Sequence, residues 1–145
     1  MNILVAVDLS PASQQVVEAA RGVADLTGVS VHVLHVVEAD PVFAGENAEP
    51  ELVRSKVAEE FPLEYQGVQT LVEKLQDEGL DATALLACGP AVENTLREAD
   101  SLKAGLIVVG THGHGAVYDV LIGSYSAGII RKSRLPVLVV PIREI

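Results

Sequence analysis

The chain has 145 residues, a length that fits a single domain over residues 1–145 with a substantial core. Its 10 basic and 20 acidic residues give a net charge of −10, which argues against binding to nucleic acid or anionic lipid. Only 3% of residues are aromatic, so a ring platform for base stacking is excluded, and the one cysteine, Cys88, forms no intrachain disulfide. The start of the sequence has no basic signal-peptide region and the apolar runs are too short to cross a bilayer, so we expect a cytoplasmic protein.

Five short apolar runs predict β-strands. Most of them are nearly continuous rather than alternating, which is typical of parallel strands covered by helices on both faces of the sheet. The third run is weaker, because Asp81, Thr83 and several alanines interrupt it, and we expect it nearer a sheet edge. The runs are Asn2–Asp8, Ser30–Val37, Leu80–Ala87, Leu106–Gly110 and Pro136–Pro141.

Helical patterns lie between these runs. In the first, Ser10 serves as N-cap, Pro11 takes the first helical position and Gly28 ends the helix. The others are expected over Leu63–Glu78, from Pro90 onward, and over Asp119–Ser133. Because strands and helices alternate, the predicted fold class is α/β with a doubly wound parallel sheet and helices on both faces.

The segment 39–62 differs from the rest of the chain. It carries six acidic residues and three prolines, and we expect a helical piece only around Leu52–Glu60. A solvated loop is one interpretation. A lid or a surface for a protein partner is the other.

The strongest functional signal follows the fourth predicted strand. Gly110, Gly113 and Gly115 fall within six residues, at the edge of the sheet where α/β proteins bind ligands. Nine residues after Gly113 comes Gly123-Ser124, at an apolar helical stretch. Two turns rich in backbone amides that face one cavity could hold a polyphosphate without any lysine, although glycines at such turns are also compatible with tight connections alone.

The pattern Gly110-x-x-Gly113, nine residues, Gly123-Ser124 resembles the ATP-binding motif of the universal stress protein family. The runs Val108–Gly113 and Leu135–Val140 resemble the fourth strand with its loop and the last strand of that family. Ile3–Ser10 and Leu34–Val36 resemble the first and second strands. The resemblance extends over essentially the whole chain.

The resemblance implies a five-stranded sheet of order 3-2-1-4-5 and a homodimer formed through the C-terminal strand 136–141. It also implies an ATP site, with a magnesium or manganese ion held through the phosphates and no metal site made by protein residues. Asp8 would lie beside the adenine or ribose, and the backbone at Val36 would meet the adenine edge. The implied nucleotide-binding residues are Asp8, Val36, Val109, Gly110, Thr111, His112, Gly113, His114, Gly123, Ser124, Tyr125 and Ser126.

Several positions depart from the family pattern: Cys88-Gly89-Pro90 replaces a Gly-x-Pro turn, Gly105 stands where an acidic residue usually precedes the fourth strand, and two further departures bear on the site. His114 stands where many members carry Arg or Lys, which predicts weaker or pH-dependent phosphate binding. Tyr125 replaces a small aliphatic residue, and its bulk could crowd the site.

The functional hypothesis is a dimeric, ATP-binding regulatory protein of the stress-response type, with no catalytic residues. Hydrolysis should be slow, because the sequence offers no dedicated general base and no Lys or Arg aimed at a γ-phosphate. The alternative is an interaction dimer with a vestigial site, in which Tyr125 and His114 block the triphosphate and the acidic segment recruits partners. The open edge of the Val-rich last strand is a separate, physical reason to expect dimerisation.

Overall fold

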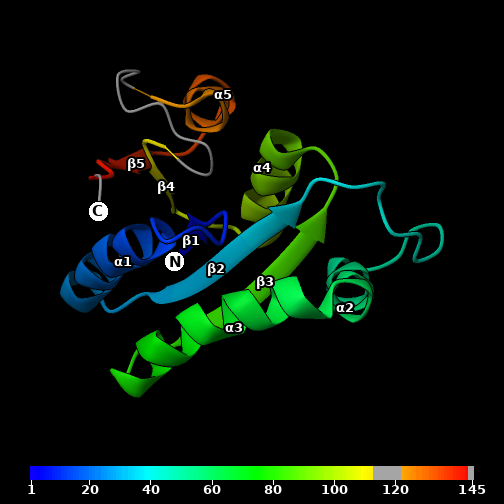
Figure 1. Ribbon diagram of the computed structural model, residues 1–145, viewed down its shortest axis with the longest axis horizontal. Helices are drawn as coiled ribbons and strands as arrows, with labels where there is room; N and C mark the ends of the chain where they lie inside the picture. Colours follow the sequence, from blue (N-terminus) through cyan, green and yellow to red (C-terminus); the bar gives the residue numbers. More distant parts are fainter. Residues whose placement is uncertain (113–121, 144–145) are drawn as a thin grey trace.

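The computed structural model describes residues 1–112 and 122–143. Five parallel strands form one sheet in the order β3-β2-β1-β4-β5 (Figure 1), which confirms the predicted fold class and strand order. The third strand lies at a sheet edge, as its weaker pattern predicts. The strands are β1 (Asn2–Ala6), β2 (Ser30–Val37), β3 (Ala82–Cys88), β4 (Leu106–Gly110) and β5 (Val137–Val140).

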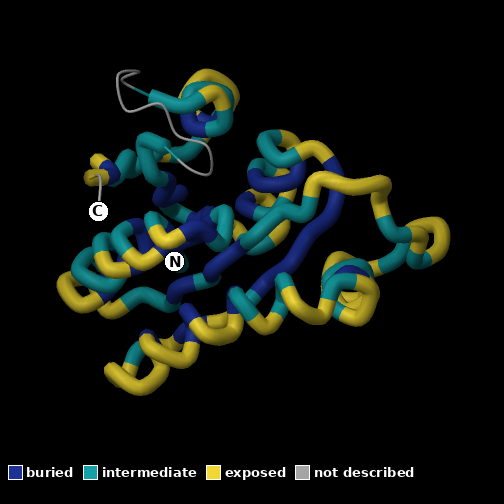
Figure 2. The backbone as a smooth tube through the Cα atoms, viewed as in Figure 1, coloured by how far each residue is buried: buried dark blue, intermediate teal, exposed yellow. Residues whose placement is uncertain are grey.

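Helices cover both faces of the sheet. The apolar side chains of α1, α2 and α3 pack into one core cluster, and those of α4 and α5 pack into a second cluster on the opposite face. Figure 2 shows the strands at the buried centre and the solvent-facing sides of the helices exposed. The helices are α1 (Ser13–Thr27), α2 (Pro50–Glu60), α3 (Pro62–Asp77), α4 (Ala91–Ser101) and α5 (Ser124–Lys132). In the described residues, no helix is long and apolar enough to cross a membrane.

The predicted junction between the first strand and the first helix is wrong in detail. The strand ends at Ala6 rather than Asp8, and the helix begins at Ser13 rather than Pro11. The Asp8 carboxylate accepts hydrogen bonds from the Ser10 amide, at 3.0 Å, and from the Ser13 hydroxyl, at 3.2 Å. An Asp side chain that binds an amide two residues on favours a turn over either regular element, so the Ser10-Pro11 pair lies in a turn.

Segment 39–62 contains more helix than expected, because α2 starts at Pro50 and α3 already begins at Pro62. The loop before α2 is held to the sheet by Cys88, whose thiol donates a hydrogen bond to the Asp40 carbonyl at 3.0 Å. Burial raises the pKa of the Cys88 thiol, so it stays protonated and keeps this bond. Cys88 itself is buried.

The last helix is shorter than the predicted Asp119–Ser133. Helix α5 runs over Ser124–Lys132, and residues 119–121 lie outside the described part of the chain. Gly123 takes the N-cap position with an extended backbone, so the Gly123-Ser124 pair opens the helix. The final strand, β5, is shorter than the predicted 136–141 by one residue at each end.

Candidate functional site

The two glycine segments of the motif meet at the carboxyl edge of the sheet. The Gly123 amide donates a hydrogen bond to the Thr111 carbonyl oxygen at 2.7 Å, which ties the start of α5 to the loop after β4. Residues 111 and 123 are twelve positions apart, so this bond brings the fourth strand's loop and the helix opening to one place. Gly113 and His114, both predicted to bind nucleotide, lie outside the described residues.

The opening of α5 provides backbone donors. Ser124, Tyr125 and Ser126 form its first turn, and the amides of a helix's first turn have no acceptor within the helix. The first main-chain bond of the helix comes from Ala127, whose amide donates to the Gly123 carbonyl at 2.9 Å. Together with the helix dipole, these amides suit an anion such as a phosphate.

The side chains of this turn point in different directions. The Ser126 hydroxyl donates to the Gly110 carbonyl and is buried, so Ser126 joins α5 to β4 and offers a phosphate only its backbone amide. The Tyr125 hydroxyl lies 2.7 Å from the Thr95 hydroxyl oxygen on α4. Because Thr95 donates its own proton to the Ala91 carbonyl, at 2.8 Å, Tyr125 is the donor in this pair. Ser124 is exposed.

Tyr125 therefore packs toward α4, into the second core cluster, rather than across the site. The expectation that its bulk crowds the site is not supported by this orientation. The sequence analysis missed Thr95, its partner. Only the tertiary contact shows what this hydroxyl binds.

Replacing Tyr125 with phenylalanine should affect stability and leave nucleotide affinity unchanged. Burial raises the pKa of Tyr125 to about 12, so the phenol ionises more readily in the unfolded chain, near its ordinary value of about 10. The stability contributed by the neutral phenol is complete below about pH 10 and is lost as the pH rises through about 12. In urea unfolding, Tyr125→Phe should lower the free energy of unfolding by about 1 kcal/mol at pH 7. Between pH 9 and 12, the free energy of unfolding should fall less steeply in the variant than in the unchanged protein. An equally steep alkaline loss in the variant would contradict this account.

Gly110 is required by packing as well as by the motif. A Cβ at this position would lie 3.0 Å from Ile142 Cγ1 and 3.0 Å from Val16 Cγ2. The absence of a side chain lets α1 and the C-terminal segment close over the end of β4. Gly110 thus shapes the site through the backbone, and Val109 beside it is fully buried.

Thr111 is held from several directions. Its amide donates to the Val140 carbonyl at 2.9 Å, and its hydroxyl oxygen accepts from the Ile142 amide at 3.0 Å. The same oxygen lies 3.0 Å from His112 Nδ1. Ile142, which the sequence analysis did not single out, is therefore a supporting residue of the site, two residues beyond the end of the edge strand β5.

Asp8 and Val36 come to the same edge from β1 and β2. The Asp8 carboxylate shapes the turn into α1 through its bonds to Ser10 and Ser13. His35, next to Val36, donates from Nδ1 to the Val7 carbonyl at 2.9 Å and so ties the ends of the two strands together. Val36 itself is half-buried and packs against the second cluster.

Among the described residues, metal-ligating side chains do not gather at this edge. In residues 1–112 and 122–143, no three His, Cys, Asp or Glu side chains come together in a way that could hold a metal ion. Amide donors suit phosphate oxygens directly, and a cation that accompanies a polyphosphate would be held through the phosphates.

Residues 1–141 match the model of the family described as universal stress protein family. Universal stress protein A homolog 1 of Coxiella burnetii is 34% identical over 145 residues, covering 99% of this chain and 97% of the relative. A universal stress protein of Thermus aquaticus is 31% identical over 145 residues, covering 96% of this chain and 97% of the relative.

Solved structures share the fold. Protein MJ0577 of Methanocaldococcus jannaschii superposes with a TM-score of 0.79 at 22% identity, covering 99% of this chain and 97% of that one. A universal stress protein in complex with cAMP superposes with a TM-score of 0.71 at 22% identity, covering 99% of this chain and 98% of that one. The Archaeoglobus fulgidus universal stress protein in complex with dAMP superposes with a TM-score of 0.65 at 25% identity, covering 97% of each chain.

Proposed function

Because this chain belongs to the universal stress protein family, we propose that it binds ATP and acts as a dimeric regulatory protein rather than as an enzyme. The observation that carries the proposal is the 2.7 Å hydrogen bond from the Gly123 amide to the Thr111 carbonyl. This bond places the first-turn amides of α5 beside the loop after β4, at the edge of the sheet where α/β folds bind ligands. Related structures with cAMP and with dAMP support an adenine nucleotide as the ligand.

Backbone amides explain how a chain with a net charge of −10 holds a polyanion. They provide donors at fixed positions, and they need no lysine or arginine. Thr111 and Ser124 lie on the two segments that this bond joins, and both carry hydroxyl groups. Magnesium or manganese, carried on the phosphates, would neutralise part of the ligand's charge when bound.

Regulation requires that the nucleotide bind one conformation better than another. Thr111 connects the site to the C-terminal segment, because its carbonyl accepts from the Gly123 amide and its hydroxyl oxygen accepts from the Ile142 amide. A nucleotide that binds beside Thr111 therefore acts on the residues that follow β5. We expect ATP hydrolysis to be slow, because none of the proposed site residues is assigned the role of a general base.

The open edge of β5 supports dimerisation. The Ile107 amide donates to the Pro136 carbonyl and the Thr111 amide to the Val140 carbonyl, so alternate residues of β5 face β4. Val137 and Val139 then direct their main-chain groups away from the sheet. Pairing of this edge with a second copy across a two-fold axis would satisfy those groups and cover the valines.

Nucleotide content and titration test the proposal. Freshly purified protein is denatured and its supernatant analysed, and the emptied protein is then titrated with Mg-ATP and with AMP by calorimetry. We expect bound adenine nucleotide or saturable binding, and a dimer by sedimentation at micromolar concentration. No nucleotide and no heat up to millimolar ATP would leave the interaction-dimer alternative, and rapid turnover of ATP would make the protein an enzyme.

A further inference from the structure

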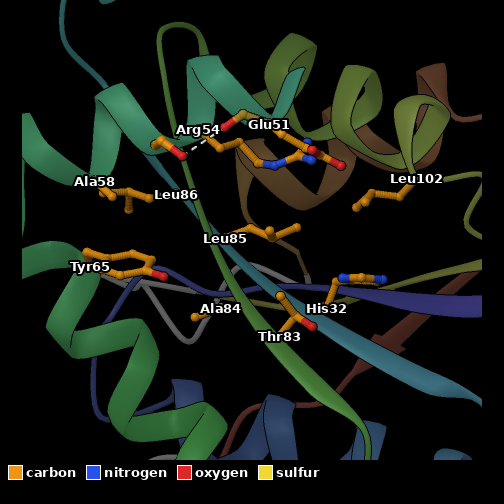
Figure 3. A pocket seen from close by; sticks show the side chains of 11 residues that line it. His32, Glu51, Arg54, Ala58, Tyr65, Thr83, Ala84, Leu85, Leu86 and Leu102 are labelled. Atoms are coloured by element: carbon orange, nitrogen blue, oxygen red, sulfur yellow. Dashed lines mark hydrogen bonds between the residues drawn. The ribbon is translucent and has the colours of Figure 1, made fainter. Parts of the chain in front are cut away.

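A hollow of about 510 Å³ lies beside α2 and the strands β2 and β3, and its lining residues are not those of the nucleotide site. Figure 3 shows Arg54 and Glu51 of α2 on one side of it. His32 and Thr83 of the sheet lie on the other side, with Leu85 between. Glu51 and Thr83 are exposed, whereas Leu85 is buried. The hollow therefore opens to solvent at a polar rim and closes on an apolar floor.

Arg54 brings hydrogen-bond donors to the hollow. Its Nη1 donates to Glu98 Oε2 on α4 at 2.7 Å, and the two side chains are only 14% and 13% exposed. This ion pair fixes the guanidinium between α2 and α4. A guanidinium has five N–H donors, and Arg54 makes no other hydrogen bond within residues 1–112 and 122–143. The remaining donors can bind an acceptor, and their forked geometry suits a carboxylate.

Glu51 provides the opposite charge on the same helix. It stands three residues before Arg54 on α2, so the two side chains leave the same side of the helix, and both line the hollow. The Glu51 carboxylate forms no ion pair with any residue that the structure describes. A ligand that places a carboxylate on Arg54 can therefore place an ammonium group on Glu51.

The charge balance of the hollow favours a zwitterion. Arg54 and Glu98 neutralise each other, and Glu51 leaves one negative charge. Burial lowers the pKa of His32, the positive charge of Arg54 lowers it further and Asp81 opposes them, so His32 is neutral at pH 7. A simple anion would lie close to two carboxylates, and a simple cation would leave the guanidinium donors unused. A zwitterion pairs with both signs and adds no net charge.

The floor of the hollow provides an apolar surface. Leu85 and Leu102 both line it, and both pack in the second core cluster. Figure 3 shows both side chains beside the polar groups of Arg54 and His32. An apolar group of a ligand would remove part of this surface from water, and the volume leaves room for a branched or aromatic side chain.

We propose that this hollow binds a free amino acid with an apolar side chain. The carboxylate of the ligand accepts hydrogen bonds from Arg54, and its ammonium group donates to Glu51. Its side chain packs against Leu85 and Leu102. The ligand enters at the exposed rim, so the hydrogen bonds of β3 and the position of α2 stay as they are. This site is separate from the proposed nucleotide function and does not depend on it.

Methyl NMR with L-leucine as the probe tests the proposal on the whole protein. The methyl resonances of Leu85 and Leu102 should shift saturably, with a Kd of about 1 mM or lower. Leu26 on α1 is 90% exposed and does not line the hollow, so its methyl resonances serve as the internal control. Unchanged Leu85 and Leu102 resonances at millimolar L-leucine would overturn the proposal.

Three analogues of the probe test the three contacts one by one. Leucinamide lacks the carboxylate, 4-methylpentanoate lacks the ammonium group and glycine lacks the apolar side chain. Each should bind at least tenfold more weakly than L-leucine, because each loses one charged or apolar contact. An analogue that binds as tightly as L-leucine would refute the contact that it lacks, and with it the proposed ligand class.

A matched pair of variants locates the ammonium contact. Glu51→Gln changes an exposed side chain without an ion-pair partner in the described chain, and should weaken L-leucine binding about tenfold while 4-methylpentanoate binds no more weakly. Glu59→Gln makes the same change at an exposed position of α2 that does not line the hollow, and should have no effect. Equal L-leucine affinity in the two variants would contradict the proposal. Both should bind Mg-ATP as the unchanged protein does, so failure of this site and failure of the nucleotide site are distinguishable.

Discussion

Replacement of Gly123 with valine should abolish adenine-nucleotide binding and leave the protein folded. A Cβ at this position would lie 3.3 Å from the Thr111 carbonyl oxygen and 3.9 Å from His112 Cα. The two methyl groups of valine would push the loop after β4 away from α5 and break the Gly123–Thr111 hydrogen bond. Calorimetric titration with Mg-ATP should show an affinity loss of more than about tenfold, or about 1.4 kcal/mol. Circular dichroism should be unchanged.

Gly22 in α1 provides a matched control. No atom lies within 4 Å of a Cβ built there, so Gly22→Val adds the same side chain in open space, far from the motif. This control should bind nucleotide as the unchanged protein does. Unaltered affinity in Gly123→Val would mean that Gly123 forms only a turn. The interaction-dimer alternative would then gain support.

Replacement of Ile129 with alanine should cause a large loss of stability. Ile129 is 0% exposed and packs in the second core cluster. Only Ser126 and Ile129 are buried among the residues of α5, so this side chain is the main apolar anchor of the helix. Deleting its buried methyl groups should lower the free energy of unfolding by about 2–5 kcal/mol, measured by urea denaturation. Nucleotide affinity should also fall, because α5 carries the proposed phosphate-binding amides.

The adjacent residue provides the comparison. Ile130 is 46% exposed, so Ile130→Ala makes the same chemical change on the solvent side of the same helix. Its effect on the free energy of unfolding should stay below about 1 kcal/mol. Similar losses in both variants would show that Ile129 does not anchor the helix, and the packing described for α5 would be wrong.

Much of the fold follows from local pattern. The run Ser30–Val37 has apolar residues at both odd and even positions, because a parallel strand in the middle of a sheet is covered on both faces, and the structure has β2 over the same residues. The interrupted third run was correctly placed at an edge, because a strand at the edge of a sheet is less completely covered. The junction after β1 was not predicted correctly, since an Asp side chain bonded to a nearby amide competes with both strand and helix.

The sequence by itself determined the fold class, the helix positions between the strands, and the spacing of the glycines around the candidate site. Those properties depend on periodicity and on backbone freedom, which are local. Only the tertiary structure decided what each side chain near the site contacts. Ser126 bonds to Gly110, and Tyr125 turns to Thr95, although both stand in the motif beside Ser124. These directions depend on partners 16 and 30 positions away in the chain, and no local pattern encodes which partner the folded sheet brings within reach.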